Sequence, residues 1–124
     1  MTHFSVGIIV PPQFIDDYEA YVERQMAPHD ANRIVATYRT ASGELINAWN
    51  PDGHWNEYEI NGESHGWTGD IFSIEEMLSS GNYLSLPTSL VTPDGIWHDS
   101  GPMSYQRMLY AFHGHSVVLL NAHN

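Results

Sequence analysis

Apolar residues fill almost every position of two segments, one near each end of the chain. Residues 4–10 read Phe-Ser-Val-Gly-Ile-Ile-Val, and residues 115–121 read His-Ser-Val-Val-Leu-Leu-Asn. Short runs of this kind, rich in β-branched residues, are typical of strands in the interior of a sheet. We therefore expect the two terminal strands to lie together in the middle of one sheet.

Three segments have the spacing and the end signals of helices. Apolar side chains recur at helical spacing over residues 13–27, with acidic residues mostly on the other side. Residues 73–80 begin with a capping box formed by Ser73 and Glu76, which predicts a short helix. A last helix is predicted within residues 102–114, between a proline and a glycine.

The phrase Pro-Asp-Gly-x-Trp occurs twice, at residues 51–55 and 93–97. Proline and aspartate favour the middle of a tight turn, and glycine supplies the positive φ that closes it. We expect a hairpin at each phrase, with Gly53 and Gly95 at positive φ. A tryptophan at the root of each hairpin is expected to pack in the core, because its large ring gains most by burial.

A further hairpin is predicted where segments 34–39 and 44–49 flank a turn that contains glycine. A strand and a helix at the front of the chain, and a helix and a strand at its end, thus bracket a set of hairpins. This order favours a single domain over residues 1–124, an α+β two-layer sandwich. Its sheet is expected to be mostly antiparallel with helices on one face, and a ferredoxin-like order is one candidate for the core.

The charge of the chain is strongly unbalanced. Fifteen acidic residues face four arginines, there is no lysine, and the formal net charge is −11. Such a surface repels phosphates and anionic membranes, so we expect no direct binding to nucleic acid or to membranes. The same field favours a partner protein with a basic surface, although plain solubility also accounts for an acidic composition. The absence of cysteine excludes disulfides and fits a reducing cytoplasm.

Residues 50–62 read Asn-Pro-Asp-Gly-His-Trp-Asn-Glu-Tyr-Glu-Ile-Asn-Gly, and this run is similar to a Trp-Asp-Trp-Tyr-x-Ile-Gly-Gly-Arg-Trp signature. That signature belongs to a group of small proteins of tailed bacteriophages and prophages, which segments 26–30, 92–98 and 117–123 also resemble. In place of Gly-Gly-Arg-Trp, residues 61–67 carry no arginine, so an anion-binding role is not carried over. The resemblance implies a phage setting in a host cytoplasm and no particular activity.

Few residues here suggest catalysis or metal binding. The pair His113 and His115 with His123 could bind a metal through neutral imidazoles, but ordinary surface histidines are the simpler interpretation. The chain has no cysteine, no lysine and no Gly-x-Ser-x-Gly nucleophile motif, so phosphate-loop chemistry is excluded. We therefore expect neither a metal, nor a cofactor, nor a catalytic site.

Acidic and aromatic residues gather instead between the first Pro-Asp-Gly phrase and residue 67. Carboxylates beside a histidine can do acid–base chemistry, but alternating glutamates also suit the solvent face of a strand. Trp67 lies in a glycine-rich loop with little apolar company, which makes it the best candidate for an aromatic contact. The expected binding surface consists of Trp67, Glu57, Glu59, Tyr58, Glu63 and His65.

Two classes of function follow from these residues. The first is a non-enzymatic, phage-encoded protein that inhibits a host or anti-phage defence protein through this acidic, aromatic surface. It would be an anti-CRISPR-like inhibitor or a nucleic-acid mimic. The second is a protein that binds a small molecule or nucleotide, or a small hydrolase, with His54, His65, His98 and the tryptophans around one pocket. Salt should weaken the first kind of binding and not the second. The sequence leaves the partner and the oligomeric state open.

Overall fold

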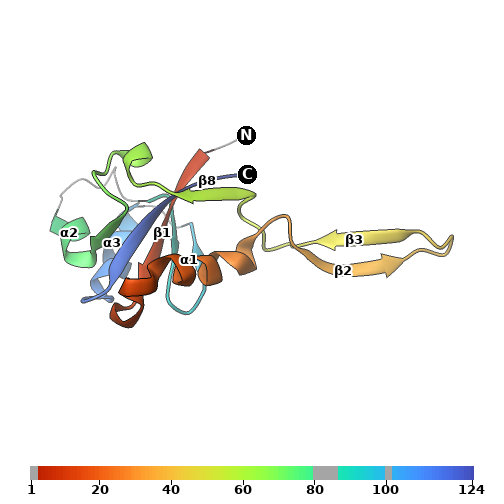
Figure 1. The fold of residues 1–124 in the computed structure, drawn as a ribbon, viewed down its shortest axis with the longest axis horizontal. Coiled ribbons are helices and arrows are strands. Elements are labelled where there is room, and N and C mark those ends of the chain that lie inside the picture. Colours follow the sequence, from red (N-terminus) through yellow and green to blue (C-terminus); the bar gives the residue numbers. More distant parts are fainter. Residues whose placement is uncertain (1–2, 80–86, 100–101) are drawn as a thin grey trace.

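The computed structural model describes residues 3–79, 87–99 and 102–124; the side chains of His65, Pro102 and Met103 are outside the described part. The expected end of the second helix, at residue 80 before Gly81, therefore lies outside the described residues. Figure 1 shows a body built on one sheet, from which a hairpin projects to one side. We call this hairpin the arm and the remainder the body.

The two terminal strands lie side by side at the centre of the main sheet, as the sequence predicts. The strand order is β4-β8-β1-β6-β7, and β5 also pairs with β8. β1 and β8 are antiparallel along their whole length, whereas β6 runs parallel to its neighbour β1. This parallel pair departs from the antiparallel sheet of a ferredoxin-like core. The strands are β1 (His3–Val10), β4 (Glu57–Ile60), β5 (Ile71–Ser73), β6 (Ser89–Val91), β7 (Trp97–His98) and β8 (Ser116–His123).

Helices cover both faces of this sheet. α1 (Tyr18–Met26) packs on one face, where alternate residues of β1 and β8 are buried with Val22 and Met26. α2 (Ile74–Ser79) and α3 (Pro102–Tyr110) pack on the other face, around Ile9 and Leu119. The α+β class is confirmed, but the expectation that helices lie on one face is wrong. Because both central strands are apolar at successive positions, both of their faces have to be covered.

The helix ends follow local signals. The predicted helix over 13–27 is divided into a 3-10 turn, η1 (Pro12–Asp17), then α1 and a second 3-10 turn, η2 (Ala27–His29). The capping box of α2 is confirmed: the Glu76 amide donates to Ser73 Oγ at 3.1 Å, and the Ser73 amide donates to Glu76 Oε1 at 3.4 Å. A third 3-10 turn, η3 (Glu63–His65), follows β4.

The two Pro-Asp-Gly phrases form different structures. The second is the expected hairpin, since β6 pairs with β7 and Gly95 has φ +85°. The first is not a hairpin, because the strand before it belongs to the arm and β4 pairs with β8. The expected positive φ of Gly53 is also wrong. A Cβ at Gly53 would lie 2.4 Å from the Cα of Ala31, so glycine is needed there for close approach.

The arm consists of β2 (Ile34–Arg39) and β3 (Leu45–Trp49), which form the predicted hairpin with Gly43 at φ +89° in its turn. Its root is fixed to the body by one asparagine. The Asn50 side-chain amide donates to the carbonyls of Pro28 at 2.8 Å and Asp30 at 3.1 Å. The Asn50 backbone amide also donates to the carbonyl of Arg33 at 2.8 Å. The arm therefore leaves the body in a defined direction.

Candidate functional site

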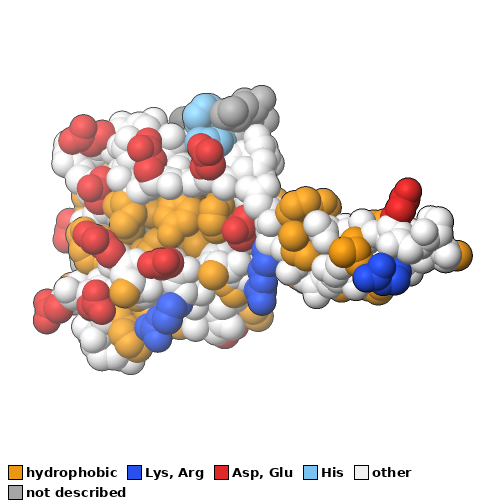
Figure 2. Space-filling model, turned by 45° about the vertical axis from the view of Figure 1, so that its right-hand side comes forward, with side chains coloured by type: hydrophobic (Ala, Val, Ile, Leu, Met, Phe, Trp, Pro, Cys, Tyr) orange, Lys and Arg blue, Asp and Glu red, His pale blue; other side chains and the backbone are white. Residues whose placement is uncertain are grey.

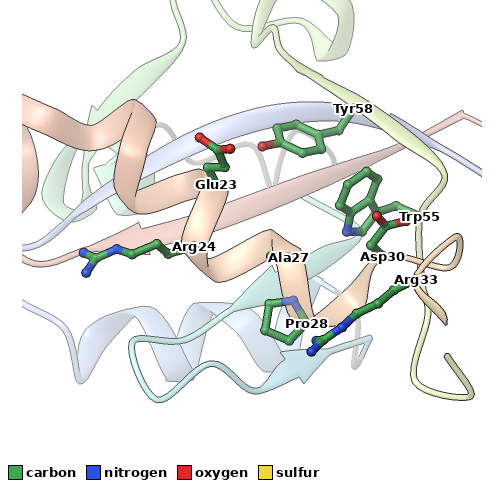
Figure 3. A pocket seen from close by; sticks show the side chains of 8 residues that line it. All are labelled: Glu23, Arg24, Ala27, Pro28, Asp30, Arg33, Trp55 and Tyr58. Atoms are coloured by element: carbon green, nitrogen blue, oxygen red, sulfur yellow. The ribbon is translucent and has the colours of Figure 1, made fainter. Parts of the chain in front are cut away.

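An open groove lies at the root of the arm, between α1 and the chain that enters β4 (Figure 3). Its volume is about 630 Å³. Figure 2 shows a band of hydrophobic side chains across this side of the molecule, bordered by Asp and Glu side chains. The groove is lined by Glu23, Arg24, Ala27, Pro28, Asp30, Arg33, Trp55 and Tyr58.

Two aromatic rings form one wall of the groove. The rings of Trp55 and Tyr58 meet edge to face, with centroids 4.9 Å apart and an interplanar angle of 88°. The Trp55 indole is held in place because its Nε1–H donates to the Met26 carbonyl at 2.9 Å. Both rings are half-buried and pack on the core beneath α1. The Trp55 ring is thus anchored to α1, and the aromatic wall exposes one side to solvent.

Carboxylates complete the site. The Glu23 carboxylate points toward the Tyr58 hydroxyl (Figure 3), and burial together with the Glu23 charge raises the pKa of Tyr58. Asp30 lines the same groove and its Oδ1 accepts a hydrogen bond from the Asn32 amide at 2.8 Å. Arg24 lies 5.2 Å from the ring centroid of Phe14, so its cation is also engaged by an aromatic face. Aromatic faces beside carboxylates suit a bound cation.

The structure separates the acidic residues that the sequence grouped. Because side chains alternate along a strand, Tyr58 lies toward the groove whereas Glu57 and Glu59 are exposed away from the core. Glu57 Oε2 lies 2.8 Å from Nε2 of His123, and Glu59 Oε1 accepts a hydrogen bond from Asn61 at 3.3 Å. Glu63 is exposed on η3, and the side chain of His65 is outside the described part.

The expected surroundings of Trp67 are wrong. Its ring is half-buried and packs against the core beneath α2 and α3, with its centroid 4.8 Å from that of Phe72. The loop that carries Trp67 is bent back onto the sheet, because the Trp67 amide donates to the Gly62 carbonyl and Asp70 Oδ1 accepts from the Gly62 amide. Trp67 therefore belongs to the packing of the body.

Sequence reasoning missed Glu23 and Asp30, and it assigned Trp55 to the core alone. Glu23 has the pattern of an ordinary solvent-facing acid on a helix, and Asp30 follows the helix in an irregular segment. An isolated parallel β-bridge places the backbone of Trp55 beside that of Asp30. No local signal in the sequence indicates this long-range contact.

A second, smaller cavity of about 300 Å³ contains part of the alternative histidine and tryptophan pocket. His54 stacks on Trp97 with centroids 4.5 Å apart and an interplanar angle of 5°. His98 lies elsewhere, with Nε2 3.0 Å from Thr92 Oγ1. Ser89 Oγ, which also lines this cavity, donates to Asp99 at 2.5 Å.

The candidate metal ligands lie at opposite ends of β8. His113 Nδ1 is 3.3 Å from Glu75 Oε1 in the turn before the strand, whereas His123 ends the strand beside Glu57. Within the described part of the chain, no group of three or more His, Asp or Glu side chains could hold a metal ion. His113, His115 and His123 thus form no common site.

Fold and site together define an α+β protein with an aromatic groove at the root of a projecting arm, lined by two carboxylates and two arginines. Comparison with known proteins finds no matching family model, no similar curated protein and no similar solved structure. None of the helices described here is long and apolar enough to cross a membrane.

Proposed function

We propose that this chain is a non-enzymatic binding protein that recognises a basic segment of a partner protein in the groove between α1 and β4. One observation carries the proposal: two perpendicular aromatic rings, Trp55 and Tyr58, lie beside the carboxylates of Glu23 and Asp30. An arginine or lysine side chain would place its stem on the rings and its charge beside the carboxylates.

The charge of the whole molecule supports the same role. A net charge of −11 accelerates encounter with a basic surface and opposes binding to nucleic acid. The exposed Glu57, Glu59 and Glu63 extend the acidic surface beyond the groove, as a nucleic-acid mimic requires. With the resemblance to phage proteins, the proposed partner is a host or anti-phage defence protein with a basic surface, bound and inhibited in the host cytoplasm.

The test compares two glutamates of α1 in affinity capture from host lysate, with partners identified by mass spectrometry. Glu23 lines the groove, whereas Glu19 is also exposed and does not line it. We expect Glu23→Gln to weaken binding of the captured partner about 5- to 10-fold at low salt and less at high salt, as a charge-assisted contact requires. Glu19→Gln should bind as the wild type does. Equal behaviour of the two variants would contradict the proposal.

The stacked pair His54 and Trp97 favours one second candidate, a site for a small planar ligand in the smaller cavity. The cavity is also lined by Asp99, whose carboxylate accepts from the Trp97 indole at 2.9 Å. Binding of an uncharged planar ligand there should be insensitive to salt, whereas the net charge of −11 opposes the phosphates of a nucleotide. A thermal-shift screen of nucleosides and nucleotides at low and high salt measures this, with His54→Ala as the variant that should abolish any shift.

A further inference from the structure

The arm exposes an unusual amount of apolar surface for a segment that projects into solvent. Its large apolar side chains are 47% to 64% exposed, and Figure 2 shows them along its length. Among the described residues, β2 and β3 pair with each other and not with the main sheet. An isolated two-stranded hairpin is at best marginally stable in water, so a surface that covers the arm would stabilise it. The exposed residues are Ile34, Val35, Tyr38, Leu45, Ile46 and Trp49.

The two faces of the arm differ in chemistry. Residues opposite one another on an antiparallel pair share a face, and the pairs Ala36–Ala48 and Tyr38–Ile46 lie on one face. We call these four residues the apolar face of the arm. The opposite face also carries apolar residues, namely Leu45 and the pair Ile34 and Trp49, but a polar pair interrupts it. Thr37 and Asn47 lie between them and are joined by a hydrogen bond of 3.2 Å.

We propose that the apolar face of the arm is the contact between two copies of this chain, packed antiparallel about a two-fold axis. A large pair, Tyr38 and Ile46, lies next to a small pair, Ala36 and Ala48. In antiparallel packing the large pair of each copy lies over the small pair of the other, as a self-complementary interface requires. Parallel packing would place large on large and leave the alanines uncovered.

The charge distribution also favours a second copy at this place. Only Glu44 of the fifteen acidic residues lies on the arm or in its turn, where Arg39 accompanies it. The body carries the other fourteen acidic residues, so contact between two bodies is opposed by repulsion. Antiparallel arms join the two copies where acidic residues are fewest and place the acidic bodies at opposite ends.

Hydrogen bonds also hold the root of the arm in one orientation before a second copy binds. Asn50 fixes its root through hydrogen bonds to Pro28, Asp30 and Arg33, so little conformational freedom is lost when the arm is covered. The contact is small, and interfaces below about 1,200 Å² of total buried area are generally weak. We therefore expect a dimer with a dissociation constant of tens of micromolar, on the order of 6 kcal/mol of binding free energy. This inference uses none of the groove residues and goes beyond the proposed function.

Sedimentation velocity tests the proposal with two neighbouring residues as a matched pair. Ile46 and Leu45 are 52% and 64% exposed but lie on opposite faces of β3. Between about 5 and 500 µM the wild type should pass from mainly monomer to mainly dimer. Ile46→Lys should raise the dissociation constant more than ~10-fold, because it buries a charge, and Leu45→Lys should leave it unchanged. A wild type that stays monomeric, or equal effects of both variants, would overturn the proposal.

A spin label tests the arrangement without a change in the contact itself. The chain has no cysteine, so Ser42→Cys at the tip of the arm provides a single labelling site. A two-fold axis at Thr37 and Asn47 places each tip about 17 Å away, from five residues at ~3.4 Å each. Pulsed electron spin resonance should then give an intermolecular distance of about 35 Å. A distance below about 20 Å, or none, would refute antiparallel packing.

Discussion

At the scale of single residues, His29 is an ionisable group whose pKa is shifted by burial. It lies at the end of η2, almost completely buried, with Nε2 2.9 Å from the carbonyl oxygen of Gly95. A carbonyl only accepts, so Nε2–H is the donor, and among the described residues Nδ1 has no hydrogen-bond partner. Burial lowers the pKa of His29, and nearby His54 acts in the same direction, against the Gly95 hydrogen bond and Asp52.

This lowered pKa predicts acid sensitivity. The unfolded chain takes up the His29 proton near pH 6.5, before the native protein does. The free energy of unfolding therefore has its full value above pH 6.5, where His29 is neutral in both states. It decreases as the pH falls from 6.5 toward the lower pKa of native His29. Within that window the free energy of unfolding should fall by up to about 1.4 kcal/mol per pH unit. Urea denaturation between pH 7.5 and 5 measures it.

A glutamine at position 29 can keep the hydrogen bond to Gly95 without titrating. His29→Gln should therefore remove part of the pH dependence of stability. The exposed His113 provides the control, and His113→Gln should keep the wild-type slope. If His29→Gln and the wild type lose stability with the same slope, the assignment to His29 is wrong.

Gly53 gives a second prediction at this scale. An alanine there would place its Cβ 2.4 Å from Cα and 2.8 Å from Cβ of Ala31, where backbone has to move. We expect Gly53→Ala to lower the free energy of unfolding by about 3 kcal/mol, as overpacking does. Gly43→Ala has open space but a φ of +89°, so its cost should be about 1 kcal/mol. Thermal unfolding measures both variants. If Gly53→Ala and Gly43→Ala lower the free energy of unfolding by the same amount, the contact with Ala31 is unimportant.

At the scale of elements, the loop between β4 and β5 is part of the body because Trp67 packs beneath it. Trp67→Ala should destabilise the protein by about 2 kcal/mol, less than for a fully buried tryptophan. Trp49 on β3 is 57% exposed, and Trp49→Ala should change the free energy of unfolding by less than about 0.5 kcal/mol. Thermal unfolding followed by circular dichroism measures both. If the Trp67→Ala protein is as stable as the wild type, the assignment of Trp67 to the packing of the body is wrong.

At the scale of the whole molecule, the body and the arm are separate structural units. The two core clusters lie on the two faces of the main sheet, and neither includes a residue of β2 or β3. The arm begins and ends at one hydrogen-bonded pair, the Asn50 amide and the Arg33 carbonyl, 2.8 Å apart. A short turn can therefore close the chain at this point without displacing the groove.

This geometry predicts that the arm can be removed. Replacement of residues 34–49 by Asn-Gly should leave the thermal midpoint of the body within a few degrees of the wild type, because neither core loses a side chain. Calorimetry measures the midpoint, and the partner captured through the groove should still bind. A shortened protein that fails to unfold cooperatively would show that the arm stabilises the body.

Local patterns in the sequence were sufficient to predict those elements that are specified by a few neighbouring residues. The apolar runs predicted β1 and β8, Ser73 and Glu76 predicted the start of α2, and the second Pro-Asp-Gly phrase predicted its hairpin with Gly95 at positive φ. Of the expected binding residues, Tyr58 lines the groove. Each of these features depends on neighbours in the chain, so the physical cause is present in the sequence itself.

Tertiary structure decided the rest, because contacts between distant segments compete with local preference. The same Pro-Asp-Gly phrase forms no hairpin at Gly53, since β8 offers β4 a better partner than the arm does. Glu23 becomes a site residue because Trp55 and Tyr58, more than thirty residues later, are folded against α1. The sequence thus determined the two central strands, the start of α2 and the acidic charge. Which side chains face one groove, and which apolar ones stay exposed on the arm, depended on long-range packing that no local pattern encodes.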